Sequence, residues 1–225
     1  MLVPTCWYAN TVKIATILGS PRRRGNTATV LGLFEGMIPT PHKVERIKIV
    51  DYQIDGCRGC GACQWDLTEP GCIQRDDAGV LLQRLMKTDV IVYATPLYVW
   101  GFAAQMKAFV DRHYCLVKWA DGHVANALLR GKRAALLVTC GDVSESAADL
   151  IQGIFDREMR YLGCEVVGKY VVPGCTTPDR LGSKGVDAAT EMVRDIIGSA
   201  SSGSPADSSL SGSGSLPESV MSITE

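Results

Sequence analysis

Residues 19–27 read Gly-Ser-Pro-Arg-Arg-Arg-Gly-Asn-Thr and lie between two segments with different hydrophobic patterns. Before them, residues 12–18 are mostly apolar, which is typical of a buried strand. After them, residues 28–37 carry apolar side chains at helical spacing. A short loop of this kind turns the free N–H groups of a helix start outward, where the helix dipole favours an anion. The segment therefore predicts an anion site at the first strand-to-helix loop of the chain.

The side chains of this loop favour phosphate as the anion. Ser20, Asn26 and Thr27 supply hydrogen-bonding groups, and one or more of the arginines at 22–24 can meet a phosphate with a fork of N–H groups. The loop contains neither G-x-G-x-x-G nor G-x-x-x-x-G-K-[ST], which disfavours a dinucleotide cradle and a triphosphate loop. A single terminal phosphate, as on FMN, fits better. The alternative is an ordinary turn in which Asn26 or Thr27 caps the helix and the arginines are solvated.

The composition indicates one domain of ordinary size with a tail. The 225 residues are 46% hydrophobic and carry a formal net charge of −1, so nothing draws the chain as a whole to nucleic acid or to an anionic membrane. No apolar run reaches transmembrane length and residues 1–10 do not read as a signal peptide, so we expect a cytoplasmic protein. We expect an N-terminal extension over 1–11, a folded domain over 12–198, and a disordered Ser/Gly-rich tail over 199–225.

The hydrophobic pattern predicts five strands that alternate with helices. The strands are expected at 12–18, 42–50, 89–94, 132–139 and 165–172, and the helices at 28–37, 78–86, 103–114, 147–162 and 186–197. Such alternation is typical of an α/β fold with a doubly wound parallel sheet. The strand order 2-1-3-4-5 brings the loops after strands 1, 3 and 4 to one sheet edge, with the ligand at the switch point between strands 1 and 3. Residues 115–130 are expected to be a mobile excursion.

Two of the helices carry expectations about individual side chains. In the helix at 103–114, Lys107, Asp111 and Arg112 are predicted to face solvent. The helix at 147–162 is predicted to bury one stripe, which consists of Leu150, Ile151, Ile154, Phe155, Met159 and Leu162. Asp77 is expected to cap the helix that follows it.

The loop at 51–78 holds four of the nine cysteines, Cys57, Cys60, Cys63 and Cys72. A crowded set of this kind indicates metal or redox chemistry rather than a disulfide framework. Thiolates at C-x2-C-x2-C can hold three corners of a [4Fe–4S] cluster, and Cys72 is the candidate for the fourth. The alternatives are zinc, which prefers two separated C-x2-C pairs, reduced or redox-active thiols, and a disulfide in an oxidising compartment.

Together these motifs resemble the flavodoxin-like NAD(P)H-dependent FMN reductase superfamily, and residues 12–197 are most similar to its iron–sulfur flavoproteins. The pieces that carry the resemblance are residues 19–27, Cys57-Arg58-Gly59-Cys60-Gly61-Ala62-Cys63 with Cys72 and Asp76-Asp77, Thr95-Pro96-Leu97-Tyr98, Gln105-Met106-Lys107 and Asp111-Arg112. The resemblance implies a flavodoxin-like fold with FMN as cofactor and a [4Fe–4S] cluster at the cysteines.

The resemblance also implies roles for individual residues. The FMN phosphate would be held by Ser20, Arg22, Asn26 and Thr27. The ring and ribityl chain would be lined by Pro96, Leu97, Tyr98, Val99 and Trp100 and, on the other side, by Cys140, Gly141 and Asp142. The metal ligands would be Cys57, Cys60, Cys63 and Cys72. No side chain is assigned as catalytic, because the flavin carries the chemistry. For Tyr98 and Trp100, the alternative is hydrophobic packing over the sheet edge.

The expected function is that of an FMN-dependent oxidoreductase that moves electrons from ferredoxin or NAD(P)H to a small-molecule acceptor through FMN and the cluster. We expect a homodimer or homotetramer, with no nucleic-acid or membrane partner. A cluster-free NAD(P)H:FMN or quinone reductase is the first alternative. A non-catalytic electron carrier of the flavodoxin type is the second.

Overall fold

The computed structural model describes residues 11–144 and 146–198. Its main sheet contains β1 (Lys13–Leu18), β2 (Lys43–Lys48), β3 (Val90–Pro96), β6 (Arg133–Thr139) and β7 (Glu165–Val172). All four neighbouring pairs are parallel, in the order β2-β1-β3-β6-β7. Counted within this sheet, that order is 2-1-3-4-5, so the predicted doubly wound topology is confirmed.

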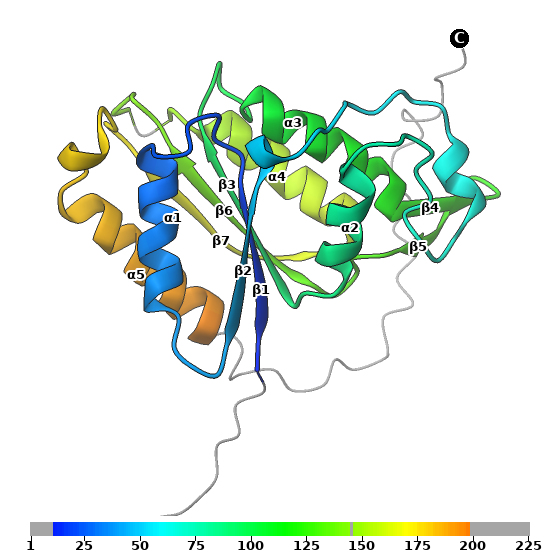
Figure 1. Cartoon of the computed structure of the whole chain (residues 1–225), viewed down its shortest axis with the longest axis horizontal. Helices are drawn as coiled ribbons and strands as arrows, with labels where there is room; N and C mark the ends of the chain where they lie inside the picture. The colour runs from blue at the N-terminus through cyan, green and yellow to red at the C-terminus, as the bar shows by residue number, and fades with distance from the viewer. Residues whose placement is uncertain (1–10, 145, 199–225) are drawn as a thin grey trace, which may run out of the picture.

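Helices cover both faces of the sheet (Figure 1). One face carries α1 (Asn26–Met37) and α5 (Ser183–Gly198), and the other carries α2 (Ala78–Met86), α3 (Ala104–Asp111) and α4 (Asp149–Leu162). Because a parallel sheet covered in this way is dry on both faces, its central strands are continuously apolar. In β1, Ile14 and Leu18 belong to one core while Ala15 and Ile17 belong to the other.

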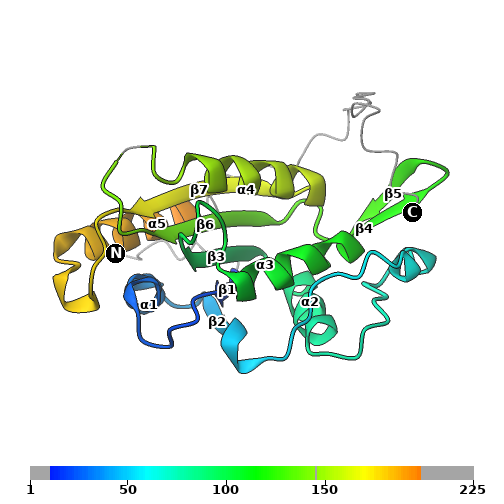
Figure 2. The same cartoon turned by 90° about the horizontal axis from the view of Figure 1, so that it is seen from above.

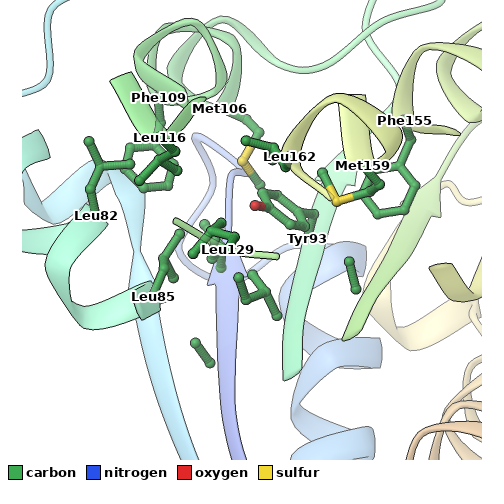
Figure 3. Close-up of a cluster of buried hydrophobic side chains, with 14 of the residues drawn as sticks. Leu82, Leu85, Tyr93, Met106, Phe109, Leu116, Leu129, Phe155, Met159 and Leu162 are labelled. Atoms are coloured by element: carbon green, nitrogen blue, oxygen red, sulfur yellow. The ribbon is translucent and has the colours of Figure 1, made fainter. Parts of the chain in front are cut away.

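The larger core lies between the sheet and the layer formed by α2, α3 and α4. Figure 3 shows side chains of these three helices closing around Tyr93 of β3, among them Leu85, Met106 and Phe155. Tyr93 is fully buried. The core therefore holds α3 against this face of the sheet.

A hairpin replaces the predicted mobile excursion at 115–130, so that expectation was wrong. The 3-10 helix η3 (Arg112–Leu116) leads into β4 (Val117–Ala120) and β5 (His123–Ala127), which pair antiparallel. The turn between them contains Asp121 and Gly122, both with positive φ. Asp-Gly is the preferred sequence for such a turn, so the signal for the hairpin was present in the chain. The hairpin projects from one end of the domain (Figure 2).

Some predicted side-chain environments also differ from the structure. Arg112 lies just beyond the end of α3 and is 1% exposed, whereas it was predicted to face solvent. Leu150 and Ile154 are 64% and 42% exposed, because the buried stripe of α4 runs through Ile151, Phe155, Met159 and Leu162 alone. The expectations for residues 1–10 and 199–225 lie outside the described residues. None of the helices in the described ranges is long and apolar enough to cross a bilayer.

Candidate flavin pocket and cysteine site

The first strand-to-helix loop leaves its helix start open. The N-cap of α1 is Gly25, and no side chain makes a capping hydrogen bond there, so the alternative of a turn capped by Asn26 or Thr27 is wrong. The backbone N–H groups of the first turn therefore remain available to an anion. The Asn26 Oδ1 atom is buried without a partner; as an acceptor it needs a donor group of a ligand rather than an anion. The loop itself is held by a hydrogen bond from Arg22 N to Ser20 Oγ, 3.1 Å long.

Thr27 is fixed from across the sheet. Its hydroxyl lies 2.6 Å from the hydroxyl of Thr139, at the end of β6, and both side chains are buried. Thr139 is not among the predicted site residues. The sequence marks it only by its position at the carboxyl end of the fourth strand of the sheet, directly before Cys140.

Loops from the carboxyl ends of β1, β3, β6 and β7 meet around one open pocket. Of the twelve residues predicted to contact a flavin, nine line this pocket: Ser20, Arg22, Asn26, Thr27, Pro96, Leu97, Tyr98, Cys140 and Gly141. Four further residues complete its wall, namely Gly25, Thr139, Cys175 and Thr176. The pocket thus combines the open helix start with a short aliphatic and aromatic wall, as a phosphate joined to a flat ring requires.

Val99, Trp100 and Asp142 do not line this pocket. Val99 and Trp100 form the tip of a tight turn closed by hydrogen bonds between Tyr98 and Gly101, and they are 89% and 60% exposed. Both have positive φ, 47° and 59°. A β-branched residue in this conformation is strained, and such strain concentrates at functional loops. Asp142 is exposed and accepts a hydrogen bond from Ser144 N, which, with further hydrogen bonds from Ser144 and Val143, lowers the pKa of its carboxyl.

The three loop arginines have different surroundings. Arg22 lines the pocket, while Arg23 forms an ion pair with Asp51. Arg24 is exposed and does not line the pocket. Arg22 is therefore the arginine placed to meet a phosphate.

Two thiols stand together on the far wall of the pocket. Cys140 Sγ and Cys175 Sγ both approach the carbonyl oxygen of Val172, at 3.9 and 3.1 Å, and Cys175 N donates to the carbonyl oxygen of Cys140. Burial raises the pKa of both thiols, so they are protonated at neutral pH. They therefore present neutral, polarisable groups to a ligand.

The four cysteines of the long loop line a second hollow, near the hairpin. Cys57, Cys60, Cys63 and Cys72 share it with Arg112, Cys115, Tyr114, Gln74, Gly61 and Arg58. Gly59 and Gly61 both have φ of 67°, a conformation that L side chains rarely adopt. These two glycines curl the C-x2-C-x2-C segment so that its three cysteines border the same space.

Three of the four sulfurs accept hydrogen bonds from N–H groups. The donors are Gly59 N to Cys57 at 3.4 Å, Gln64 Nε2 to Cys63 at 3.5 Å and Arg112 Nη2 to Cys72 at 3.1 Å. Hydrogen bonds of this kind stabilise thiolates and tune the potential of metal–sulfur centres.

The β4–β5 hairpin carries the cysteine loop. Gln64 donates to the carbonyl oxygen of Val117 at 3.1 Å and accepts from Trp119 N at 2.9 Å, so its side chain bonds to β4 as another strand residue would. Lys118 Nζ donates to the carbonyl oxygens of Cys63 and Pro70, at 2.7 and 3.0 Å. Asn126 holds the carbonyl oxygen of Leu67. Residues 115–130, expected to be a mobile excursion, therefore hold the cysteine loop in place.

Arg112 lines the hollow and is paired with Asp76 behind it. Its Nη1 atom lies 2.5 Å from Asp76 Oδ2 and also donates to the carbonyl oxygen of Asp55. Burial acts to raise the pKa of Asp76, but the hydrogen bonds from Arg112 and Asp55 N outweigh it and the pKa is lowered. Asp77, expected to be a helix cap, stands at the N-cap position of α2 without capping it, and its carboxylate accepts from Gln53 N instead.

Four cysteines border the hollow, which is the number of thiolates that a [4Fe–4S] cluster needs. Among the described residues, no three His, Cys, Asp or Glu side chains converge closely enough to hold one metal ion. A [4Fe–4S] cluster places its thiolates on four different irons, so its ligands surround a volume instead of meeting at one point. Cys115 also borders the hollow, but burial raises its pKa to about 12 and its thiol donates to the carbonyl oxygen of Arg112 at 3.0 Å. The donor set that fits a cluster is therefore the four loop cysteines.

The two sites are separate within one chain. Their linings share no residue. In both views, α3 lies between the start of α1 and the 3-10 helix η2 (Ala62–Trp65) of the cysteine loop (Figures 1 and 2).

The fold and the pocket define a flavodoxin-like mononucleotide-binding protein. The family model described as NADPH-dependent FMN reductase matches residues 12–172, and the chain belongs to this family. It is a flavin-dependent oxidoreductase.

Relatives agree with the family, and structural neighbours share the fold. The chain is 30% identical over 182 residues to an iron-sulfur flavoprotein of Archaeoglobus fulgidus, covering 80% of this chain and 77% of that protein. It is 29% identical over 192 residues to an iron-sulfur flavoprotein of Methanosarcina thermophila, covering 83% and 95%. The NAD(P)H:quinone oxidoreductase of Methanothermobacter marburgensis has the same fold, with a TM-score of 0.65 at 15% identity over 82% of this chain and 96% of that chain. An FMN-dependent NADH-azoreductase of Bacillus anthracis, solved in complex with FMN, has a TM-score of 0.60 at 14% identity over 83% and 99%.

Proposed function

We propose that the protein is an iron–sulfur flavoprotein that passes electrons between a reduced donor, ferredoxin or NAD(P)H, and a small-molecule acceptor. FMN would lie in the pocket at the start of α1, and a [4Fe–4S] cluster would be held by Cys57, Cys60, Cys63 and Cys72. When bound, FMN supplies hydride and single-electron chemistry and the cluster supplies single-electron transfer. The observation that carries the proposal is that all four cysteines of one segment border a single hollow whose buried arginine donates to Cys72.

The protein's own residues have separable tasks in this proposal. The open first turn of α1 and Arg22 bind the phosphate, while Thr139 holds Thr27 in place. Leu97, Tyr98 and the neutral thiol of Cys140 enclose the ring and limit access of water. The hairpin holds the cysteine loop in a shape that keeps its thiols together.

The separation of the two sites favours electron transfer between subunits. Because α3 lies between them within one chain, we propose a homodimer or homotetramer in which the cysteine loop of one subunit meets the flavin pocket of its partner. Exposed apolar side chains on that loop, Trp65, Leu67 and Ile73, suit such a contact. Light scattering on the purified holoprotein should show more than one chain per particle, and a monomer that exchanges electrons internally would contradict this arrangement.

Anaerobic purification with iron, sulfide and FMN measured per chain tests the cofactors. We expect about four irons and about four sulfides, with one FMN. Changing Cys60 to serine should abolish iron but spare FMN, because the two linings do not overlap. Cys115→Ser is the matched control, since Cys115 borders the same hollow but its thiol is protonated and bonded to a carbonyl.

Two other outcomes would assign a different function. A yellow preparation with FMN and no iron would make the protein a cluster-free NAD(P)H:FMN or quinone reductase. FMN and iron without steady NAD(P)H or ferredoxin oxidation in the presence of acceptor would favour a non-catalytic electron carrier.

A further inference from the structure

The buried side chains that hold the cysteine loop in place carry more positive charge than negative charge. Arg112 is 1% exposed and Lys118 is 0% exposed. Arg112 is paired with Asp76, whose side chain is 8% exposed. Lys118 directs its hydrogen bonds in the described structure to two backbone carbonyl oxygens, those of Cys63 and Pro70. Asp66, whose field also acts on Lys118, is exposed to solvent.

A buried cation without a buried counter-ion is unfavourable unless an anion comes to it. The Nε atom of Arg112 is buried and has no partner, while its Nη2 atom is 3.1 Å from Cys72 Sγ. Arg112 therefore contacts a thiol of the hollow, and Lys118 contacts the backbone of Cys63, whose thiol borders the hollow. The missing negative charge matches a set of ligated thiolates.

We propose that Arg112 and Lys118 are positioning residues that balance the charge of the ligated cysteines and, together with Asp76, set the reduction potential of the cluster. This inference rests on the proposed function. Reduction adds one negative charge to the hollow, so each buried cation should favour the reduced state and the buried carboxylate should oppose it. Because Arg112, Lys118 and Asp76 are buried, salt screens their effects on the potential only weakly.

A purely structural role is the competing explanation. Arg112 and Lys118 also tie the loop together through the carbonyl oxygens of Asp55, Cys63 and Pro70. If the role is purely structural, replacing any one of Arg112, Lys118 or Asp76 would loosen the loop in the same way. The charge hypothesis instead predicts shifts of opposite sign for the cations and for the carboxylate.

Redox titration of the purified holoprotein under nitrogen, followed by absorbance and electron paramagnetic resonance, distinguishes the two. Lys118→Met should shift the reduction equilibrium at least about tenfold toward the oxidised state, which is about 59 mV for a one-electron couple. Asp76→Asn should shift it in the opposite direction. The double variant Arg112→Gln/Asp76→Asn should titrate at a lower potential than Asp76→Asn alone and avoids leaving Asp76 buried and unpaired.

Lys132→Met is the matched control. Lys132 is also partly buried and donates to a backbone carbonyl oxygen, that of Thr88 at 2.6 Å, which lies outside the cysteine loop at 51–78. Its replacement should leave the potential unchanged. Shifts of the same sign for Lys118→Met and Asp76→Asn, or unchanged potentials with full iron content, would overturn the inference.

Iron retention gives a second readout if a variant binds the cluster poorly. Under a chelator challenge, Lys118→Arg, which keeps the charge, should retain iron much better than Lys118→Met. Equal loss from both would show that charge is not the cause. Absence of iron from the unaltered protein would refute the proposed function itself, whereas iron-loaded protein with insensitive potentials would refute only the role of these residues.

Discussion

Replacing Gly19 by alanine should destabilise the domain, because the new methyl group would overlap helix α3. A Cβ atom at Gly19 would lie 2.6 Å from Met106 Cβ and 2.7 Å from Met106 Cε. Carbon atoms in contact are normally about 3.5–4.0 Å apart, so the overlap is about 1 Å. Met106 Cβ is fixed to the helix backbone and cannot rotate away, and both residues are buried. The helix or the loop must therefore move.

Overpacking of this kind costs about 1–3 kcal/mol. For a domain of this size, a loss of about 2 kcal/mol corresponds to a fall in Tm of roughly 4–8 °C. Equilibrium urea unfolding followed by circular dichroism measures the difference. Gly36→Ala is the control, because Gly36 is an exposed residue within α1 whose added Cβ would meet nothing within 4 Å; it should be neutral or stabilising by up to about 1 kcal/mol. A Gly19→Ala protein with an unchanged urea midpoint would refute the reasoning.

Two further predictions concern the phosphate loop and the buried thiols. Arg22→Gln should raise the Kd for FMN about tenfold or more, because a charge-assisted hydrogen bond is lost. Arg24→Gln should change the Kd little. Fluorescence quenching of FMN measures both Kd values, and an equal loss of affinity in the two variants would contradict the assignment of Arg22. Burial raises the pKa of Cys115 and Cys164 from 9.0 to about 12. The unfolded chain therefore releases these protons first, and the free energy of unfolding should be highest below pH 9 and fall as the pH rises toward 12. Cys164→Ala should make the fall of the unfolding free energy with pH shallower by up to about 1.4 kcal/mol per pH unit. Urea unfolding of this variant that shows the same fall between pH 9 and 12 would contradict the prediction.

Local patterns in the chain were sufficient to predict the sheet and to mark two candidate sites. The alternation of apolar strands and amphipathic helices predicts the parallel order, because right-handed crossovers leave few arrangements. The loop at 19–27 is recognisable as a candidate anion site because its donors are neighbours in sequence. The four loop cysteines are recognisable as a candidate metal or redox site because they are closely spaced.

Only the tertiary structure decided what surrounds those cysteines and what completes the flavin pocket. Arg112 reaches Cys72 across 40 positions of sequence, Lys118 reaches Pro70 across 48, and Thr139 reaches Thr27 across 112. Contacts between residues so far apart leave no periodic trace in the sequence, because a buried arginine at the end of a helix reads like one on its exposed face. The charge beneath the cysteine loop therefore becomes visible only when α3, the hairpin and the loop are packed together.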